Sequence, residues 1–193
     1  MSVFSLYFQL GMTHILDWNG YDHILFIIAL CAIYSLSDWR KILVLVTAFT
    51  IGHSITLALV TLDIITINAS LIEFIIPITI FVTALSNIIS AHRPVQISRI
   101  SLNYFYALFF GLIHGMGFSN YLKSIMGKSS SMVTELFAFN IGLEIGQIVI
   151  VLGYLFLTFM IVGILKTKRK TWSLITSIIV LGVSLHLIYE STF

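Results

Sequence analysis

The chain has 193 residues, of which 59% are hydrophobic and only 9% are charged, and its formal net charge at pH 7 is +2. A soluble globular domain carries about 25% charged residues, so this composition excludes an ordinary soluble domain and predicts an integral membrane protein. The small net charge does not indicate a nucleic-acid partner. The single cysteine, Cys31, excludes an internal disulfide and a thiolate cage, so any metal site must use nitrogen and oxygen ligands.

The first apolar segment, residues 4–16, is shorter than the ~17–25 residues of a membrane-spanning helix and predicts a short interfacial or re-entrant helix. Six further segments reach or approach spanning length, and each must be helical because backbone groups in hydrocarbon have to be satisfied within the segment. They cover residues 21–36, 42–62, 71–90, 104–122, 135–165 and 172–189. The sequence therefore predicts an all-α integral membrane protein, a bundle of six transmembrane helices in the lipid bilayer, with residues 1–193 as a single membrane domain.

Basic residues are divided unevenly between the two sides that these helices define. The connections on one side contain eight Lys and Arg residues, and those on the other side contain two. The positive-inside rule places the basic side in the cytoplasm and both termini outside, as in a multi-pass protein of a bacterial inner membrane. The eight are Arg40, Lys41, Arg93, Arg99, Lys166, Lys168, Arg169 and Lys170, and the two are Lys123 and Lys128.

Most acidic residues fall on the outer side of this predicted topology, and only Asp38 falls on the inner side. Such a distribution predicts an acidic vestibule that concentrates cations at the external mouth. The alternative is that acidic residues merely end helices away from the cytoplasm. The outer residues are Asp17, Asp22, Asp63, Glu73, Glu135 and Glu190.

Ionisable side chains also lie at membrane depth, where each costs at least ~2.5–3.5 kcal/mol on insertion scales. His23 falls near the outer end of the first predicted span, and His53 and His114 fall halfway along the second and the fourth. Glu144 falls in the outer half of the fifth. Because these depths agree, we expect the side chains to meet, with Asp22 beside His23, and to bind a metal ion. For Asp22 and His23, a cap or interfacial pair at the helix start is the alternative.

Other polar residues are candidates for a supporting role. Asn140 and Gln147 share one stripe of the fifth span with its carboxylate, and Thr50 can orient the imidazole three residues further on by a hydrogen bond. His186 and Glu190 share a face of the last span. For them a structural hydrogen-bonded pair and a part of the ion pathway are equally favoured.

Four segments of the chain combine glycine with histidine, aspartate or glutamate: GYDHILF at 20–26, AFTIGHSITL at 48–57, FGLIHGMGF at 110–118 and FNIGLEIGQ at 139–147. They resemble the signature blocks of the HupE/UreJ family of membrane proteins. The resemblance implies a polytopic, transporter-like protein, associated in part of the family with nickel supply to hydrogenase or urease. In that branch a shorter stretch with Pro and Gly separates a histidine from the Asp-His pair. Here seven residues, 15–21, separate His14 from Asp22, so His14 is only a supporting candidate.

The sequence therefore predicts a permease for a divalent transition-metal ion such as nickel, cobalt or zinc, held by imidazoles and a carboxylate. The alternative is a metal-binding or structural membrane subunit that moves nothing and serves a larger complex. An intramembrane enzyme is disfavoured because the sequence contains no H-x-x-H-H set, no H-E-x-x-H and no G-x-S-x-G. The sequence is compatible with a homo-oligomer or with a membrane partner.

Overall fold

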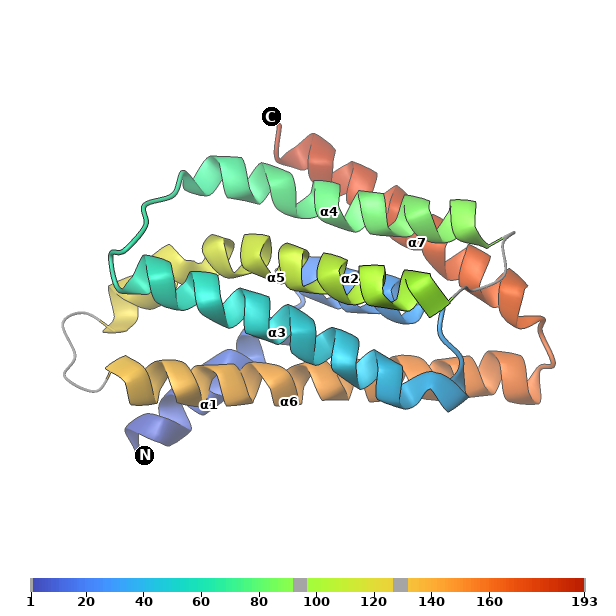
Figure 1. Ribbon diagram of the computed structural model, residues 1–193, viewed down its shortest axis with the longest axis horizontal. Helices are drawn as coiled ribbons and strands as arrows, with labels where there is room; N and C mark the ends of the chain where they lie inside the picture. The colour runs from blue at the N-terminus through green and yellow to red at the C-terminus, as the bar shows by residue number, and fades with distance from the viewer. Residues whose placement is uncertain (1, 92–96, 127–131, 193) are drawn as a thin grey trace.

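The computed structural model describes residues 2–91, 97–126 and 132–192, and every regular element in them is helical (Figure 1). Seven α-helices follow one another in this part of the chain, which confirms the predicted all-α class. They are α1 (Val3–Ile15), α2 (Asp22–Cys31), α3 (Trp39–Thr61), α4 (Ala69–Ser90), α5 (Ile97–Met126), α6 (Met132–Thr158) and α7 (Arg169–Glu190). A 3₁₀ turn, η1 (Leu36–Asp38), precedes α3, and a π-helical segment, η2 (Phe159–Ile164), extends α6.

Four continuous helical segments are long and apolar enough to cross a membrane, and they correspond to the second, third, fifth and sixth predicted spans. They are Leu36–Thr61, Ala69–Ser90, Met132–Ile164 and Arg169–Glu190. The fourth predicted span, residues 104–122, lies within α5, which has 30 residues and extends beyond the predicted limits at both ends.

The first predicted span, residues 21–36, is corrected by the structure. Its helix, α2, covers only Asp22–Cys31, roughly 15 Å at 1.5 Å per residue, against a hydrocarbon core of about 30 Å. The chain leaves the helix because Ser35 caps the next one: its backbone N–H and its hydroxyl donate to the Asp38 carboxylate at 3.0 and 2.6 Å. Residues 37–41, predicted as a connection, are therefore mostly helical.

The N-terminal helix α1 packs closely against α6, and the two helices run in the same general direction (Figure 1). Gly11 of α1 faces the Phe139 carbonyl, and Gly142 of α6 faces the Phe8 carbonyl, so closely that a Cβ at either glycine would collide with it. Such backbone contact is typical of membrane helices that carry small residues at their interface. The helix predicted as interfacial or re-entrant is therefore built into the bundle.

The helices α1 and α2 follow each other as two half-length helices, separated by a break at residues 16–21 (Figure 1). At the far end of α2, the side-chain amide of Asn87 in α4 donates to the Ala29 carbonyl at 2.7 Å. At its near end, Asp22 lines a pocket together with Ile76 of α4. The helix α2 thus runs alongside α4 in the same direction, and the break between α1 and α2 lies at the level of Ile76.

The helices α3 and α5 form a second pair in backbone contact. A Cβ at Gly111 would collide with the Phe49 carbonyl, and one at Gly115 would collide with the His53 carbonyl. The Thr56 hydroxyl adds an interhelical hydrogen bond to the Leu112 carbonyl at 2.7 Å. Because the two backbones cannot shift past each other, the histidines on α3 and α5 are held in fixed relation.

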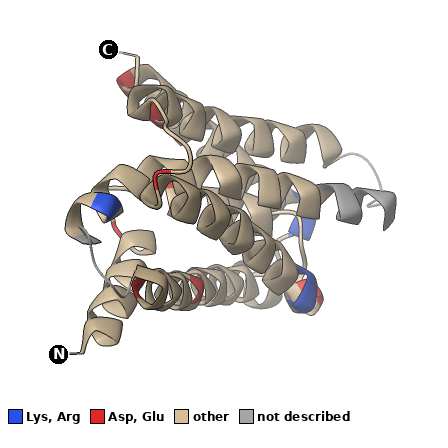
Figure 2. Cartoon of the chain, turned by 60° about the vertical axis from the view of Figure 1, so that its left-hand side comes forward, with Lys and Arg blue, Asp and Glu red and all other residues tan. Residues whose placement is uncertain are grey.

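The coloured ribbon shows charged residues mostly near the two ends of the bundle (Figure 2). Arg40 and Arg169 lie where α3 and α7 begin, whereas Glu73 lies near the opposite end, in the second turn of α4. Arg93 and Lys128, which were counted for the predicted topology, lie outside the described residues.

Candidate metal centre

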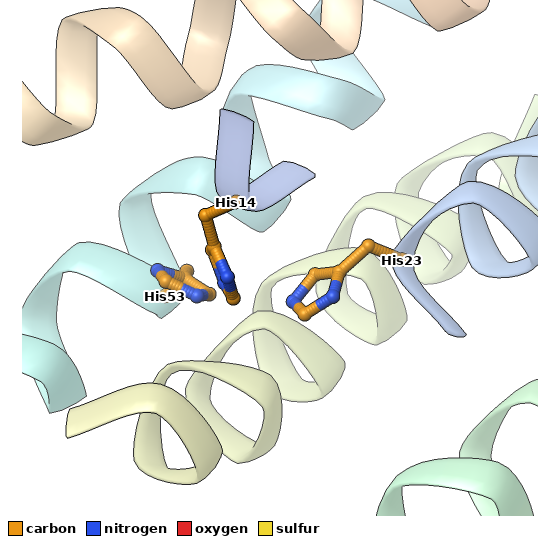
Figure 3. Close-up of side chains that lie close together, drawn as sticks. All are labelled: His14, His23 and His53. Carbon is orange, nitrogen blue, oxygen red and sulfur yellow. The ribbon is translucent and has the colours of Figure 1, made fainter. Parts of the chain in front are cut away.

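Four histidines from four helices converge next to the break between α1 and α2. His14 comes from the last turn of α1, His23 from the first turn of α2, His53 from α3 and His114 from α5. The ring centroid of His23 lies 4.8 Å from that of His14, 5.1 Å from that of His114 and 6.0 Å from that of His53. Figure 3 shows the rings of His14, His23 and His53 grouped together from three helices, and the centroids of His14 and His53 are 6.1 Å apart.

The ligand atoms form two overlapping groups. One group is His14, His23 and His53, and the other is Asp22, His23 and His114; within each, the potential ligand atoms all lie within 4.8 Å of one another. His23 belongs to both groups and is therefore the centre of the cluster. His53 and His114 are fully buried, and His23 is 5% exposed.

A threonine fixes which ring nitrogen of His114 can bind a metal. The Thr79 hydroxyl donates its single proton to the Ile76 carbonyl at 2.7 Å, so it accepts a hydrogen bond from His114 Nε2 at 3.1 Å. The proton of the neutral imidazole is then on Nε2, and Nδ1 carries a lone pair. That Nδ1 atom is buried and has no hydrogen-bond partner among the described residues.

Asp22 acts on His23 in the same way. The Nδ1 atom of His23 lies 3.0 Å from Asp22 Oδ1, to which it donates when the carboxylate is ionised. The lone pair is then on Nε2, a buried atom without a hydrogen-bond partner in the described part of the chain. A carboxylate that orients an imidazole in this manner is the usual support of a metal-binding histidine. Asp22 can therefore act as a positioning group or supply an oxygen ligand itself.

The remaining two imidazoles complete a nitrogen donor set. His14 Nε2 and both ring nitrogens of His53 are buried without hydrogen-bond partners among the described residues. A buried polar atom that makes no hydrogen bond is costly, by about 1–3 kcal/mol, and a metal ion would satisfy one ring nitrogen of each imidazole that binds it. Neutral imidazole suits nickel, copper and zinc, whereas carboxylate-rich sites suit magnesium and calcium. The donor set fits a divalent transition-metal ion.

The cluster borders a pocket of about 180 Å³ that is lined by His14, Asp22, His23, His114 and, at its rim, Asp17 and Glu73. A second pocket, of about 500 Å³, adjoins it and is lined by Asp22, Glu73 and Glu190 among others. Carboxylates thus surround the approach to the imidazoles from this side of the bundle.

The structure does not bring Glu144 to the histidines. Among the described residues, the carboxylate grouped with the imidazoles is that of Asp22. Instead, Thr47 of α3 donates to Glu144 Oε1 at 2.7 Å. Two more hydrogen bonds of 2.7 Å continue this contact between α3 and α6, from Thr50 to Gln147 Oε1 and from Ser54 to Asn140 Oδ1. The predicted polar stripe of the fifth span therefore faces α3, and Thr50 contacts α6 rather than an imidazole.

The pair on the last helix also lies apart from the cluster. His186 Nε2 is 3.4 Å from Glu190 Oε1, and both side chains are more than half exposed. Glu190 additionally borders the second pocket. The geometry is that of an exposed ion pair at the mouth of the approach.

Two groups at the site were missed in the sequence. Thr79 fixes the proton of His114, and the ring of Phe118 lies 3.8 Å from the ring of His14. Both contacts join positions far apart in the chain, and neither has a spacing signal. The sequence makes His14 only a supporting candidate because seven residues separate it from Asp22. The break at residues 16–21 nevertheless places its ring beside that of His23.

The chain matches the protein family described as HupE / UreJ protein over residues 1–191. No curated protein and no solved structure matches it. The family match includes all four clustered histidines, Asp22 and both pairs of helices in backbone contact.

Proposed function

This chain belongs to the HupE/UreJ family, and we propose that it is a permease that carries a divalent transition-metal ion such as Ni²⁺ through the buried histidine cluster. The family is a transporter family implicated in nickel and cobalt uptake and is not an enzyme family. The observation that carries the proposal is the convergence of four imidazoles with unsatisfied ring nitrogens at the break between α1 and α2.

The break itself supports an ion site. Transporters commonly bind ions where a membrane helix is interrupted, because the ends of the half-helices expose backbone groups and oriented dipoles. The carbonyl end of α1 carries partial negative charge, which favours a cation beside His14. Asp22 occupies the first turn of α2, where the positive end of the helix dipole stabilises its charge.

The proposed topology has both termini outside the cell membrane and one membrane domain over residues 1–193. In it, α1 and α2 together make the first crossing, and α3 to α7 make five more. The basic residues at the start of α3 and α7 support a cytoplasmic location for that end. The break and the histidines then lie in the outer half of the bundle.

The acidic approach supports capture of cations from outside. Asp17, Asp22, Glu73 and Glu190 line the two adjoining pockets. Their negative potential raises the local cation concentration and the capture rate. A transported ion must bind strongly enough to enter and weakly enough to leave.

Reconstitution separates this proposal from a binding subunit that moves nothing. Purified protein in liposomes that contain a metal-sensitive dye should admit Ni²⁺, Co²⁺ or Zn²⁺ with saturable kinetics, and Mg²⁺ should not compete. His23→Ala, which removes the residue common to both groups, should abolish the flux, whereas His186→Ala should retain it. Saturable binding in detergent without any flux in liposomes would favour the binding subunit.

A further inference from the structure

Three phenyl rings close the bundle directly beneath the histidines, on the side of the basic residues. The centroid of Phe26 lies 5.0 Å from that of Phe49 and 5.7 Å from that of Phe110. The same layer touches the metal centre, because Phe26 and Phe49 lie 5.1 and 5.2 Å from the ring of His114. Phe26 is fully buried, and Phe49 is 1% exposed. We call Phe26, Phe49 and Phe110 the phenyl layer.

A cavity of about 440 Å³ lies on the other side of this layer. Its wall includes Phe110 itself, with Leu30, Leu45, Asn87, Tyr34 and Asn103, and it opens at the bundle surface between α4 and α5, where Phe105 and Phe109 are exposed. Leu30, Leu45, Asn87 and Asn103 belong to the end of α2, the start of α3, the end of α4 and the start of α5, which all lie toward the basic end of the bundle, and Tyr34 follows α2. The phenyl layer therefore separates the outer pockets from an inner cavity.

The same order repeats on three helices at steps of four residues. From the metal centre inward, α2 presents Asp22, Phe26 and Leu30, and α3 presents His53, Phe49 and Leu45. On α5 the order is His114, Phe110 and Tyr106, and Tyr106 also lines the cavity. Residues four apart share a helix face, so each helix contributes one group to the metal centre, one ring to the layer and one side chain to the cavity. The three levels form a single column.

We propose that the phenyl layer is the closed inner gate of the ion path and that a hydrated cation, once past it, leaves along the polar side chains of Tyr34, Asn87 and Asn103 in the cavity beneath. The inference rests on the proposed permease function and adds the route and the barrier to it. The structure is then an outward-open state, with the imidazoles reached from the acidic pockets and blocked from the inner end.

Phenyl rings suit such a barrier because a narrow apolar constriction expels water and stops a hydrated ion without any ion-binding group. The inner cavity offers the groups needed after that barrier. The side-chain amide of Asn103 donates to the Tyr34 hydroxyl at 3.0 Å, and the Asn87 carboxamide lies at the wall. These neutral polar groups can hydrogen bond the first water shell of a cation that has left the imidazoles.

Opening requires Phe26 to leave the column, and α2 is the element that carries it. This helix has only ten residues and is bounded by the break at 16–21 on one side and by the turn before η1 on the other. By contrast, Phe49 and Phe110 lie on α3 and α5, whose backbones are in contact at Gly111. The moving ring is therefore that of Phe26, and the other two rings stay with their helices.

Cysteine accessibility tests the path without depending on transport. In a Cys31→Ala background, two buried apolar positions form a matched pair: Ile76, 7% exposed and lining both outer pockets, and Leu45, 1% exposed and lining the inner cavity. The probe is a membrane-impermeant cationic methanethiosulfonate, added to either face of proteoliposomes. We expect Ile76→Cys to react only from the outer face and Leu45→Cys only from the inner face. Adding Phe26→Ala to Leu45→Cys should make that cysteine reactive from the outer face as well.

Each outcome decides the inference. Leu45→Cys that stays unreactive from the inner face, or that reacts from the outer face with all three rings present, would overturn it. Should Phe26→Ala fail to fold, Phe26→Leu replaces it, and the two single cysteines already distinguish the alternatives. Wild-type liposomes without metal flux but with the expected accessibility pattern would refute transport while leaving the barrier and cavity in place.

Discussion

The Nε2 atom of His114 donates to the Thr79 hydroxyl across 3.1 Å, and this contact leaves Nδ1 of the same ring as the only nitrogen that can bind a metal. The Thr79 hydroxyl accepts this hydrogen bond because it donates its own proton to the Ile76 carbonyl. A side chain outside the candidate metal centre thus selects the tautomer of a histidine within it.

Removing this hydroxyl should weaken metal binding without unfolding the protein. Thr79→Val keeps the shape of the side chain but frees the His114 ring to rotate and to change tautomer. We expect the Kd for Ni²⁺, measured by calorimetry in detergent, to rise about 10–100-fold. Thr83→Val, one turn further along α4, is the matched control and should leave the Kd unchanged. Equal affinities for both variants would show that Thr79 does not set the tautomer.

Metal binding should stabilise the fold through the imidazoles and not through Glu144. Saturating Ni²⁺ at about 100 times its Kd adds about 2.7 kcal/mol to the free energy of unfolding, which a melting curve in detergent detects as a rise in Tm. His23→Ala and His53→Ala should lose this rise. Glu144→Gln should keep it, because the carboxylate bonds to Thr47 and is not grouped with the imidazoles. If Glu144→Gln loses the rise in Tm, the Glu144 carboxylate is a metal ligand.

Affinity should fall as the solution becomes more acidic. An imidazole must be unprotonated to bind a metal, so protons compete with the ion for every ligand of the cluster. We expect the Kd for Ni²⁺ to increase once the solution is acidic enough to protonate the cluster, and to recover when the pH is restored. Calorimetry in buffers of different ionisation enthalpy should detect proton release on binding where the Kd changes with pH. A Kd that stays constant down to the pH at which the protein unfolds would contradict imidazole ligands.

Glycine at the α3–α5 contact should be intolerant of a methyl group. A Cβ at Gly115 would collide with the His53 carbonyl and with Thr56 Oγ1, so Gly115→Ala should cost about 1–3 kcal/mol of stability through overpacking and should displace a metal-binding histidine. Gly182→Ala is the matched control, because a Cβ there meets no described atom within 4 Å. The measurements are Tm in detergent and the Kd for Ni²⁺. Full stability and affinity in Gly115→Ala would contradict the tight backbone contact.

The carboxylates that line the two outer pockets should raise the rate at which cations are captured. Neutralising Asp17, Glu73 and Glu190 together should slow uptake at low Ni²⁺ concentration and low ionic strength, and the difference from wild type should vanish at high salt. Asp63→Asn is the control, since this residue pairs with Lys123 and does not line either pocket. If uptake in the triple variant is unchanged at low salt, these carboxylates merely end helices on the outer side and do not attract the ion.

The sequence predicted the positions of the candidate histidines along their helices better than it predicted which side chains lie together. Depth along a helix follows from position, so His23, His53 and His114 could be placed at one level. The rotation of α6 about its axis does not follow from its own residues, and its polar stripe turned out to face Thr47 and Thr50 of α3.

The C-terminal end of α2 was predicted too late for a different reason. Residues 24–34 are all apolar, and hydropathy alone does not show that α2 ends at Cys31 and that a capping box between Ser35 and Asp38 begins the next helical segment. The same limit applies to His14. Its separation from Asp22 in sequence argues against a shared site, but the break at residues 16–21 leaves the ring centroids of His14 and His23 only 4.8 Å apart.

The two pairs of helices in backbone contact are joined to each other by the three hydrogen bonds between α3 and α6, whereas α2 belongs to neither pair. His53 and His114 lie on the α3–α5 pair and His14 on the α1–α6 pair, while His23 lies on α2. An ion bound by His23 together with the other histidines would fix α2 relative to the joined pairs. Spin labels placed between α2 and α3 should therefore show distance distributions that narrow when Ni²⁺ is added, whereas labels between α3 and α5 should show the same distribution with and without it.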